Sequence, residues 1–435
     1  MVDTTSDGDR FAATEALLAK TRDQARRGEQ RVEPRGDHPR REHIDLLDGY
    51  WYAIDPHDDW AWMRAEAPVY HDPNSDVWAV TRYQDVMLAS KDPTTFSNSH
   101  NIRPKTGPVP MMISMDDPAH KRRRMLVNRG FTPRRVRDLE GAIGAICDRL
   151  IDGVCERGEA DVIADLAAPL PLIVIADLLG VAEEDRADLL RWSDIMLSAT
   201  TGTDVAALEA GGKAMVEFQQ WLDGVLPNRK RAPGDDLISV LAHAEVDGHR
   251  LDDESLLWES LLILVGGDET TRHVIGGGTE ALLTHPDQMQ RLLDDPALIP
   301  SAVEEMLRWV SPIKTMSRYV MCEVDFGGQH LSEGDEVLLT YPSANRDADV
   351  FDGPSRFDVG REPNDHVAFG FGPHFCLGNS LARLELTIMF ERLLRRLGDL
   401  SLACDPAGLV RRPSSFISGF EAIPVTFTPS SSSMR

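Results

Sequence analysis

The amino-acid sequence predicts a mainly α-helical protein with a small β-sheet part, folded as one large domain. Apolar residues recur with a period near 3.6 through most of residues 134–308, which is typical of packed amphipathic helices. Short alternating segments punctuated by Pro and Gly lie on both sides, at 68–86 and 316–425. Because no linker separates two folding units, we expect a solvated N-terminal tail over residues 1–42 and a single domain over residues 43–435.

Turn and helix signals place the individual elements. Helical spacing predicts helices at residues 59–66, 254–284 and 377–397. Residues 68–86 predict two short strands around the turn Asp72-Pro73-Asn74. Gly180 and the segment 227–236 are expected to interrupt the helical body.

The composition excludes several classes of protein. Lys and Arg number 46 against 71 for Asp and Glu, so the formal net charge is −25, and a field of that sign repels a phosphate backbone. We therefore do not expect general nucleic-acid binding. The cysteines are few, odd in number and scattered, which indicates a reducing compartment rather than a disulfide framework, so we expect a cytoplasmic protein. They are Cys147, Cys155, Cys322, Cys376 and Cys404.

We also expect no membrane span. No stretch reaches the roughly 20 apolar residues that a span needs. The most apolar run, residues 162–181, is interrupted by Asp165, Pro169, Pro171 and Asp177. The N-terminal residues lack the apolar core of a signal peptide.

The first segment that indicates chemistry reads Phe369-Gly370-Phe371-Gly372-Pro373-His374-Phe375-Cys376-Leu377-Gly378. Backbone N–H groups and the dipole of the following helix can stabilise a thiolate, which makes Cys376 a candidate metal ligand. The glycines allow the backbone to approach a flat cofactor closely. Two alternatives remain open: a buried Cys beside a turn, and His374 with Cys376 as half of a zinc site, although no other Cys has metal-ligand spacing.

The second such segment lies within the helix expected at 254–284. Gly266 and Gly267 each cost roughly 1 kcal/mol there relative to Ala, so the missing side chains serve either tight helix packing or room for a small ligand. Thr270 follows Gly266 by four residues, so its hydroxyl can bond that carbonyl and open the helix locally. An acid, Glu269, beside a hydroxyl at such an opening can relay protons.

Together these two segments resemble the cytochrome P-450 family. The Cys segment, continued by Leu381, Ala382, Arg383 and Glu385, resembles its haem-binding loop, and the glycine-containing segment resembles its oxygen-activating helix. The resemblance covers residues 55–429 and implies the P-450 fold and a b-type haem with Cys376 as the axial thiolate ligand of the iron. It assigns catalytic roles to Glu269 and Thr270. The cofactor-binding residues that it implies are His120, Arg124, Gly266, Arg318, Phe369, Gly370, Gly372, His374, Cys376 and Gly378.

Two charged motifs gain a meaning from the resemblance. Glu305 and Arg308 lie one turn apart, and most such pairs are surface pairs of little energetic value. The resemblance instead implies a core ion pair, joined by Arg361, that supports the haem loop. Residues 117–124 predict a basic helix that begins after an acidic cap and Pro. In the family, the positions of His120 and Arg124, with that of Arg318, face the haem propionates.

The remaining cations of the basic helix and the residues after it predict a partner surface. Charge runs are usually only solvated surfaces, but the haem-thiolate side of the family is where electrons arrive. We therefore expect an acidic redox partner, a ferredoxin supplied by a ferredoxin reductase, to dock there. The cations concerned are Lys121, Arg122, Arg123, Arg129, Arg134 and Arg135.

The implied activity is that of a haem-thiolate monooxygenase, which uses O2 and two electrons to hydroxylate a lipophilic substrate. Residues 110–118, 266–273 and 416–420 resemble those of actinobacterial steroid enzymes that hydroxylate the terminal methyl of the cholesterol or cholest-4-en-3-one side chain, and repeated turns would give aldehyde and acid. Two alternatives stay open: another lipophile, such as a terpene, polyketide or branched fatty acid, and a non-catalytic haem- or lipid-binding protein. Pocket segments expected by analogy are 109–112, 195–197, 263–267, 313–316 and 416–420.

Overall fold

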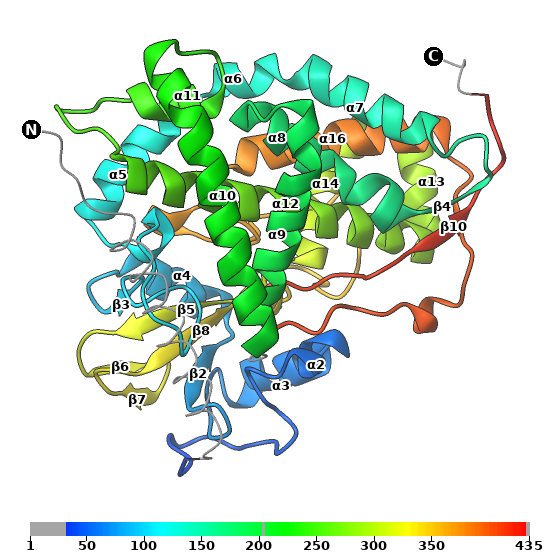
Figure 1. Cartoon of the computed structure of the whole chain (residues 1–435). Helices are drawn as coiled ribbons and strands as arrows, with labels where there is room; N and C mark the ends of the chain where they lie inside the picture. Colours follow the sequence, from blue (N-terminus) through cyan, green and yellow to red (C-terminus); the bar gives the residue numbers. More distant parts are fainter. Residues whose placement is uncertain (1–31, 202–204, 432–435) are drawn as a thin grey trace, which may run out of the picture.

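A computed structural model of the chain describes residues 32–201 and 205–431 and confirms a mainly α-helical fold with small sheets (Figure 1). Helices make up most of the molecule, with the largest sheet and the N-terminal helices below them in the view of Figure 1 and the strands β4 and β10 at the right-hand end. The helices of the body are α5 (Ala119–Val127), α6 (Pro133–Asp138), α7 (Glu140–Asp152), α8 (Pro169–Leu179), α9 (Arg186–Thr201), α10 (Val205–Arg231), α11 (Leu237–His243), α12 (Asp253–Thr284), α13 (Pro286–Asp294), α14 (Ile299–Val310) and α16 (Asn379–Arg396).

A five-stranded mixed sheet forms the core of the smaller part. Its strand order is β1 (Val69–Asp72), β2 (Val77–Val80), β8 (Glu336–Thr340), β5 (Thr315–Val320) and β3 (Phe96–Ser97). β2 runs parallel to β8, with Trp78 opposite Val337, and the other neighbours are antiparallel. Buried aromatic side chains of α2 (Gly49–Ala53) and α3 (His57–Glu66) pack on this sheet.

Short elements complete the fold. α4 (Tyr83–Lys91) and α15 (Tyr341–Ala344) contact one another beside the sheet. Two smaller sheets join β6 (Val324–Phe326) to β7 (Gln329–Leu331), and β4 (Glu159–Asp161) to β10 (Pro424–Thr426) and β9 (Ser401–Leu402). Single helical turns are η2 (Met112–Ser114), η3 (Asn128–Gly130), η4 (Val162–Ala167), η5 (Glu183–Asp185), η6 (Pro296–Leu298), η7 (Gly372–His374) and η8 (Pro406–Gly408).

The predicted elements are present with shifted ends. The helices expected at 59–66, 254–284 and 377–397 correspond to α3, α12 and α16. The hairpin expected within 68–86 forms, but the second strand ends at Val80 because Tyr83 and Val86 lie three residues apart on the buried face of a helix. α10 continues past Pro227, so the expected interruption begins only after Arg231.

The described part of the predicted tail contacts the domain. Residues 1–31 lie outside the described residues. In residues 32–42, the Arg35 guanidinium lies 2.7 Å from the Asp335 carboxylate, close to the sheet. The first described residues are therefore joined to the domain.

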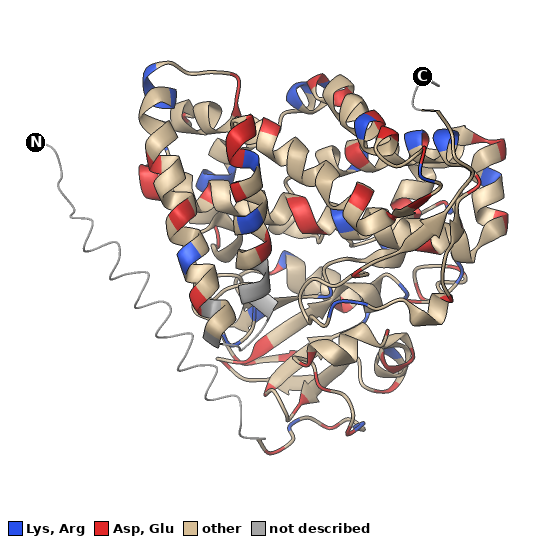
Figure 2. Cartoon of the chain, turned by 45° about the vertical axis from the view of Figure 1, so that its right-hand side comes forward, with Lys and Arg blue, Asp and Glu red and all other residues tan. Residues whose placement is uncertain are grey.

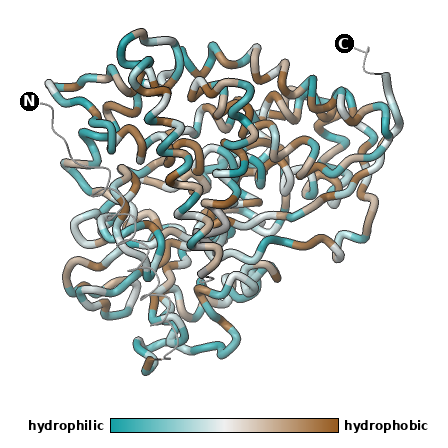
Figure 3. The backbone as a smooth tube through the Cα atoms, in the orientation of Figure 1, coloured by the Kyte–Doolittle hydropathy of each residue, from teal (hydrophilic) through white to brown (hydrophobic). Residues whose placement is uncertain are grey.

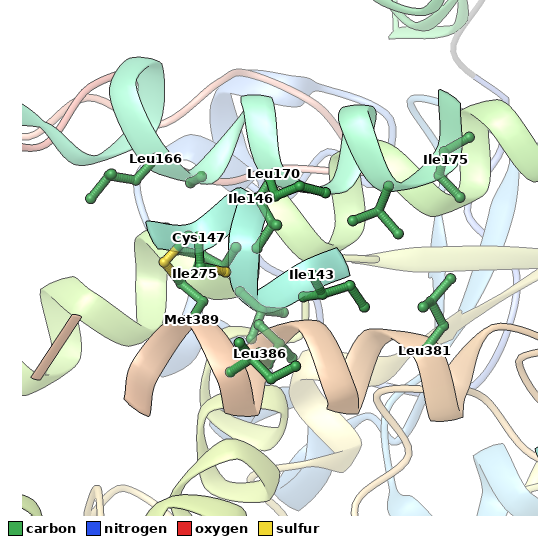
Figure 4. Close-up of a cluster of buried hydrophobic side chains, with 14 of the residues drawn as sticks. Ile143, Ile146, Cys147, Leu166, Leu170, Ile175, Ile275, Leu381, Leu386 and Met389 are labelled. Atoms are coloured by element: carbon green, nitrogen blue, oxygen red, sulfur yellow. The ribbon is translucent and has the colours of Figure 1, made fainter. Parts of the chain in front are cut away.

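The long helix α12 passes through the centre of the helical body, where α8, α14 and α16 pack against it. Apolar side chains of α7, α8, α12 and α16 meet in a continuous cluster, which includes Ile146, Leu170, Ile275 and Leu386 (Figure 4). Burying one such side chain contributes about 1.5 to 3 kcal/mol. Hydrophobic and hydrophilic residues alternate along the helices in Figure 3, as expected when one face of each is buried.

One helical stretch of the described residues has the length and apolar composition of a membrane span. It is Val162–Leu179, and 67% of it is buried inside the protein. The stretch comprises η4 and α8, which both pack against α12. Its apolar character is therefore explained by its place in the core.

Candidate active site

A cavity of about 200 Å³ lies between α12, α5, β5 and the segment that contains Cys376. Its wall brings together residues that are far apart in the sequence. Glu269 and Gly372 are the predicted site residues that do not line it. Those that do are His120, Arg124, Gly266, Thr270, Arg318, Phe369, Gly370, His374, Cys376 and Gly378.

Backbone hydrogen bonds fix the loop that carries Cys376. The Cys376 N–H donates to the Phe369 carbonyl at 2.9 Å, which closes the loop just before α16 begins at Asn379. Burial raises the pKa of the Cys376 thiol, while the N–H groups of Gly378 and Asn379 and the Arg124 guanidinium oppose that rise. The predicted stabilisation by the helix start is present but weaker than the cost of burial. A metal ion bonded to the sulfur would stabilise the thiolate at this position.

The glycines of the loop have different structural roles. Gly372 has φ +74°, and a Cβ on it would lie 2.5 Å from the Ser90 carbonyl oxygen, so it lets the loop pass close under the end of α4. Gly370 also has a positive φ, of +69°. A Cβ on Gly378 would meet nothing within 4 Å, which leaves open space on the cavity side.

Gly266 and Gly267 of α12 divide the two roles that the sequence left open, helix packing and room for a ligand. A Cβ on Gly267 would lie 2.6 Å from the Cδ1 atom of Ile175, so this glycine serves packing between α12 and α8. A Cβ on Gly266 would meet no atom within 4 Å. Gly266 therefore leaves room in the cavity, opposite the Cys376 loop.

Four basic side chains gather in the wall of the cavity. The rings of His120 and His374 lie with their centroids 4.0 Å apart. Arg124 donates to the Phe375 carbonyl, which holds α5 against the Cys376 loop. Arg318 is 3% exposed and has Tyr341 as a hydrogen-bond partner. Within residues 32–201 and 205–431, no carboxylate forms an ion pair with Arg124, Arg318 or His374.

The chemistry of this basic group calls for an anion. Burial, together with the charges of His120, Arg318 and Arg124, lowers the pKa of His374 to about 2. The Nδ1 atom of His120 lies 3.3 Å from Asp117, but its Nε2 atom is buried without a partner. Carboxylates placed here would satisfy these donors, as bidentate binding by Arg favours.

Thr270 and Glu269 lie on different sides of α12. The Thr270 hydroxyl donates to the Gly266 carbonyl at 3.0 Å, as expected from the sequence, and both residues line the cavity. The Glu269 carboxylate is buried and forms an ion pair with Arg412 of the C-terminal segment. Burial raises the pKa of Glu269, while Arg412 and Arg272 oppose that rise. The acid therefore does not open directly onto the cavity.

A buried ion-pair network supports the Cys376 loop. The Glu305 carboxylate accepts from Arg308 through both oxygens at 2.7 Å and from Arg361 at 3.0 Å. A neighbouring pair acts on the loop itself, since Glu304 accepts from Arg383, whose guanidinium lies 4.5 Å from the centre of the Phe369 ring. This is the core network that the resemblance implied.

Glu259 fixes a wall of the cavity to α12. It is fully buried, and its Oε1 atom accepts from the Met112 N–H at 2.8 Å and from Arg123 at 3.1 Å. Met112 lines the cavity. Burial raises the pKa of Glu259 to about 7, although Arg123 and the Met112 N–H oppose that rise.

The expected pocket segments contribute unequally. Met112 of 109–112 lines the cavity, as do Ile263, Gly266 and Gly267 of the α12 segment and Ile313 and Met316 of 313–316. Residues 416–420 and Ile195 do not line it, and the side chain of Leu197 lies outside the described residues. The expected segments that do line the cavity therefore contribute mainly apolar side chains.

Sequence reasoning gave no role to three charged residues of the site. They are Arg412, Glu259 and Glu385. Glu385 is 2% exposed, lines the cavity and has its Oε2 atom buried without a partner. For Glu259 and Glu385, a charge on the apolar face of a helix was the available signal. No local pattern marked Arg412, because its partner lies in another element.

The arrangement fits a haem and not a zinc ion. Among the residues that the structure describes, no three His, Cys, Asp or Glu side chains are arranged to hold a metal ion, and the His374 ring lies against the ring of His120. A single cysteine in the wall, open space at Gly266 and Gly378, and a basic group suited to carboxylates fit a flat dicarboxylate cofactor. The fold and the site thus define a haem-thiolate protein.

Comparison with known proteins identifies the family. The family described as Cytochrome P450 matches residues 213–400. A Steroid C26-monooxygenase of Mycobacterium tuberculosis is 50% identical over 389 residues, which are 89% of this chain and 98% of that protein. A Vitamin D(3) 25-hydroxylase of Pseudonocardia autotrophica is 40% identical over 401 residues, 90% of this chain and 98% of that protein. The chain therefore belongs to the cytochrome P450 family.

Solved structures agree with this assignment. A crystal structure of CYP109E1 from Bacillus megaterium in complex with corticosterone has a TM-score of 0.80 and 33% identity, and the match covers 86% of this chain and 99% of that chain. The predicted fold is confirmed. The protein is a P450 monooxygenase of the oxidoreductase class, and its cofactor is haem b with an axial cysteine thiolate.

Replacing Glu259 should change how stability depends on pH. The pKa of Glu259 rises from 4.5 to about 7 on folding. Its contribution to the free energy of unfolding is therefore fully present below the unfolded pKa and is lost as the pH rises through about 7. Since Gln does not ionise, the stability of wild type relative to Glu259→Gln should fall by on the order of 2 to 3 kcal/mol between about pH 5 and pH 8.

Urea unfolding of both proteins across this pH range measures the difference. Glu254→Gln is the matched control, because Glu254 is exposed on the same helix. A stability difference for Glu259→Gln that stays constant with pH would contradict the raised pKa.

Proposed function

We propose that this protein hydroxylates a steroid side chain, at the terminal methyl of cholesterol or cholest-4-en-3-one, and oxidises the product on to aldehyde and acid. The observation that carries the proposal is the apolar wall beside Gly266 and Thr270, to which Met112, Ile263 and Met316 contribute. A relative that is 50% identical over most of the chain bears the name Steroid C26-monooxygenase. We place this activity in a single cytoplasmic domain, residues 43–435.

Cys376 is the proposed axial ligand of the haem iron. His120, Arg124, Arg318 and His374 would hold the propionates, since these side chains gather in the wall of the cavity and Asp117 is the only carboxylate paired with them among the described residues. The backbone at Gly370 and Gly378 and the Phe369 side chain line the cavity and would contact the cofactor, while Gly372 positions the loop against α4. Once bound, the haem supplies O2 activation and the oxidation of a C–H bond.

Thr270 is the proposed proton donor inside the cavity. Its hydroxyl is held by the Gly266 carbonyl at the point where α12 faces the Cys376 loop. Glu269 is the proposed acid of the relay, and its buried carboxylate forms an ion pair with Arg412. Burial raises the pKa of Glu269 although Arg412 opposes that rise, and a carboxyl with a raised pKa is suited to proton exchange.

The proposed electron donor is a ferredoxin that docks on the outer surface of α5 and α6. Arg124 holds α5 against the Cys376 loop, so this surface lies near the thiolate. Lys121, Arg122 and Arg129 are exposed there, whereas Arg123 turns inward to Glu259 and is not a docking cation. Figure 2 shows that basic and acidic residues are mixed over the helical body.

A spectral titration tests the proposed substrate. Cholest-4-en-3-one added to the ferric holoenzyme should shift the spectrum toward the high-spin form, because the side chain displaces water from the iron. Androst-4-ene-3,17-dione, which has the same ring nucleus without the side chain, is the matched control and should bind far more weakly. Product analysis should place the new hydroxyl on the terminal methyl. A thiolate-type carbon monoxide spectrum without any steroid shift would contradict the substrate and keep the enzyme class.

Thr270→Ala should uncouple reductant consumption from hydroxylation. Loss of the hydroxyl removes the proton donor, so product formed per reductant consumed should fall at least about tenfold while hydrogen peroxide rises. Thr270→Ser keeps the hydroxyl and should restore coupling. Thr279→Ala is the matched control, because Thr279 makes the same bond to the carbonyl four residues earlier at 2.8 Å but does not line the cavity. A fully coupled Thr270→Ala enzyme would remove the relay assignment.

Neutralising the exposed cations of α5 and η3 should slow reduction by the ferredoxin. Arg122→Gln and Arg129→Gln should each lower the rate of haem reduction by about two- to tenfold at low ionic strength, with less effect at high salt. Lys213→Gln on α10, where Lys213 is 80% exposed, is matched in charge and should reduce normally. Substrate affinity should not change. An equal effect of all three variants would show that only net charge matters and would contradict the docking surface.

A further inference from the structure

A second cavity, of about 210 Å³, lies outside the haem site. It is enclosed by the N-terminal helices α2 and α3, the second half of α12, the end of α14 and the C-terminal segment 411–420. Its wall mixes aromatic rings with charged side chains. The residues that matter below are Asp55, Trp60, Glu280, Lys314, Arg346 and Arg411.

Two cations of this cavity lack a counter-charge. The Lys314 ammonium donates to the carbonyls of Val310 and Ser311, at 3.1 and 3.0 Å, where α14 ends. The Arg346 guanidinium lies 3.8 Å from the centre of the Trp309 ring, and the residue is only 8% exposed. Within residues 32–201 and 205–431, no carboxylate forms an ion pair with either side chain. Burial, with neighbouring cations, lowers the pKa of Lys314 to about 7 and that of Arg346 to about 10, because a buried cation is costly unless an anion accompanies it.

The carboxylates of the wall do not supply that anion. Asp55 lies 3.2 Å from Arg411 and 3.2 Å from His57, and it is thereby occupied. Glu280 is the other acid of the wall; burial raises its pKa, and the charges that oppose this rise are those of Arg411 and His285, not of Lys314 or Arg346. Three permanent or potential cations, Lys314, Arg346 and Arg411, thus face two acids.

Unused hydrogen-bond donors point the same way. The Nε atom of Arg346 and the Nε1 atom of Trp60 are buried, and neither has a hydrogen-bond partner. Both side chains belong to the wall of the cavity. These groups can donate but cannot accept, so their natural partner is an oxygen that carries negative charge.

We propose that this cavity binds a small oxyanion, a carboxylate or a phosphate, between Lys314 and Arg346. Its oxygens take the third N–H of Lys314 and the free donors of Arg346, and the rings of Trp60 and Trp309 form the apolar side of the site. The bound anion would link three segments that are distant in sequence: α3 with Trp60, the end of α14 and the residues after it with Trp309 and Lys314, and the chain just after α15 with Arg346. Arg411 of this site precedes Arg412, which holds Glu269.

The experiment is calorimetric titration of the holoenzyme with inorganic phosphate and, separately, with sodium acetate, at an ionic strength held constant with NaCl. The haem occupies the first cavity, so that cavity does not compete. One of the two anions should bind saturably to one site and raise the melting temperature. Lys314→Gln should weaken this binding about tenfold or more, since one charged hydrogen bond is lost.

Matched variants keep the test decisive. Lys213→Gln removes one exposed charge on α10 and should leave anion binding unchanged. Arg346→Gln removes the other proposed ligand and should also weaken binding, which gives a second test if Lys314→Gln does not fold. Absence of saturable binding with both anions would overturn the proposal. So would binding that Lys314→Gln and Arg346→Gln leave as strong as in wild type. Steroid binding is measured separately, so failure here does not bear on the proposed function.

Discussion

A single buried carboxylate organises the segment that presents the cofactor ligand. Glu305 of α14 accepts hydrogen bonds from Arg308 and Arg361, from the Asn364 amide and from the Asp358 N–H. Arg308 in turn donates to backbone carbonyls between 345 and 356. A buried ion pair stabilises only when its remaining hydrogen bonds are satisfied, and here they are satisfied by the chain that leads to Cys376. The position of the thiol therefore depends on a charge that never meets solvent.

The need of a buried charge for a partner also explains the basic side chains in the cavity walls. The chain carries a net charge of −25, yet the basic group at His120, Arg124, Arg318 and His374 has almost no acid beside it. In a folded interior, unpaired cations such as Arg124 and Arg318 are retained where an anion completes them, and we propose that the haem propionates do so in the first cavity. Lys314 and Arg346 form a similar group beside the second half of α12. The distribution of buried charge thus indicates candidate anion sites that the net charge of the chain does not reveal.

Much of this architecture could be predicted because its signals are local. The Cys376 loop and the Gly266 to Thr270 segment carry their spacing in consecutive residues, and α12 and α16 follow from apolar periodicity. The hydrogen bond from Thr270 to Gly266 spans one helical turn and was therefore foreseeable. The length of the second strand of the hairpin was not, because alternation continues into Tyr83 although burial favours a helix there.

The sequence by itself determined the family, the cofactor ligand candidate and the residues that can meet within one turn or one loop, because those interactions depend on spacing along the chain. Only the tertiary structure decided which side of α12 each neighbour faces. It assigned Gly266 to the cavity and Gly267 to packing on Ile175, and it turned Glu269 toward Arg412. It also brought Glu259 to Met112. Such partners lie far apart in the sequence, and their contact is set by how helices pack.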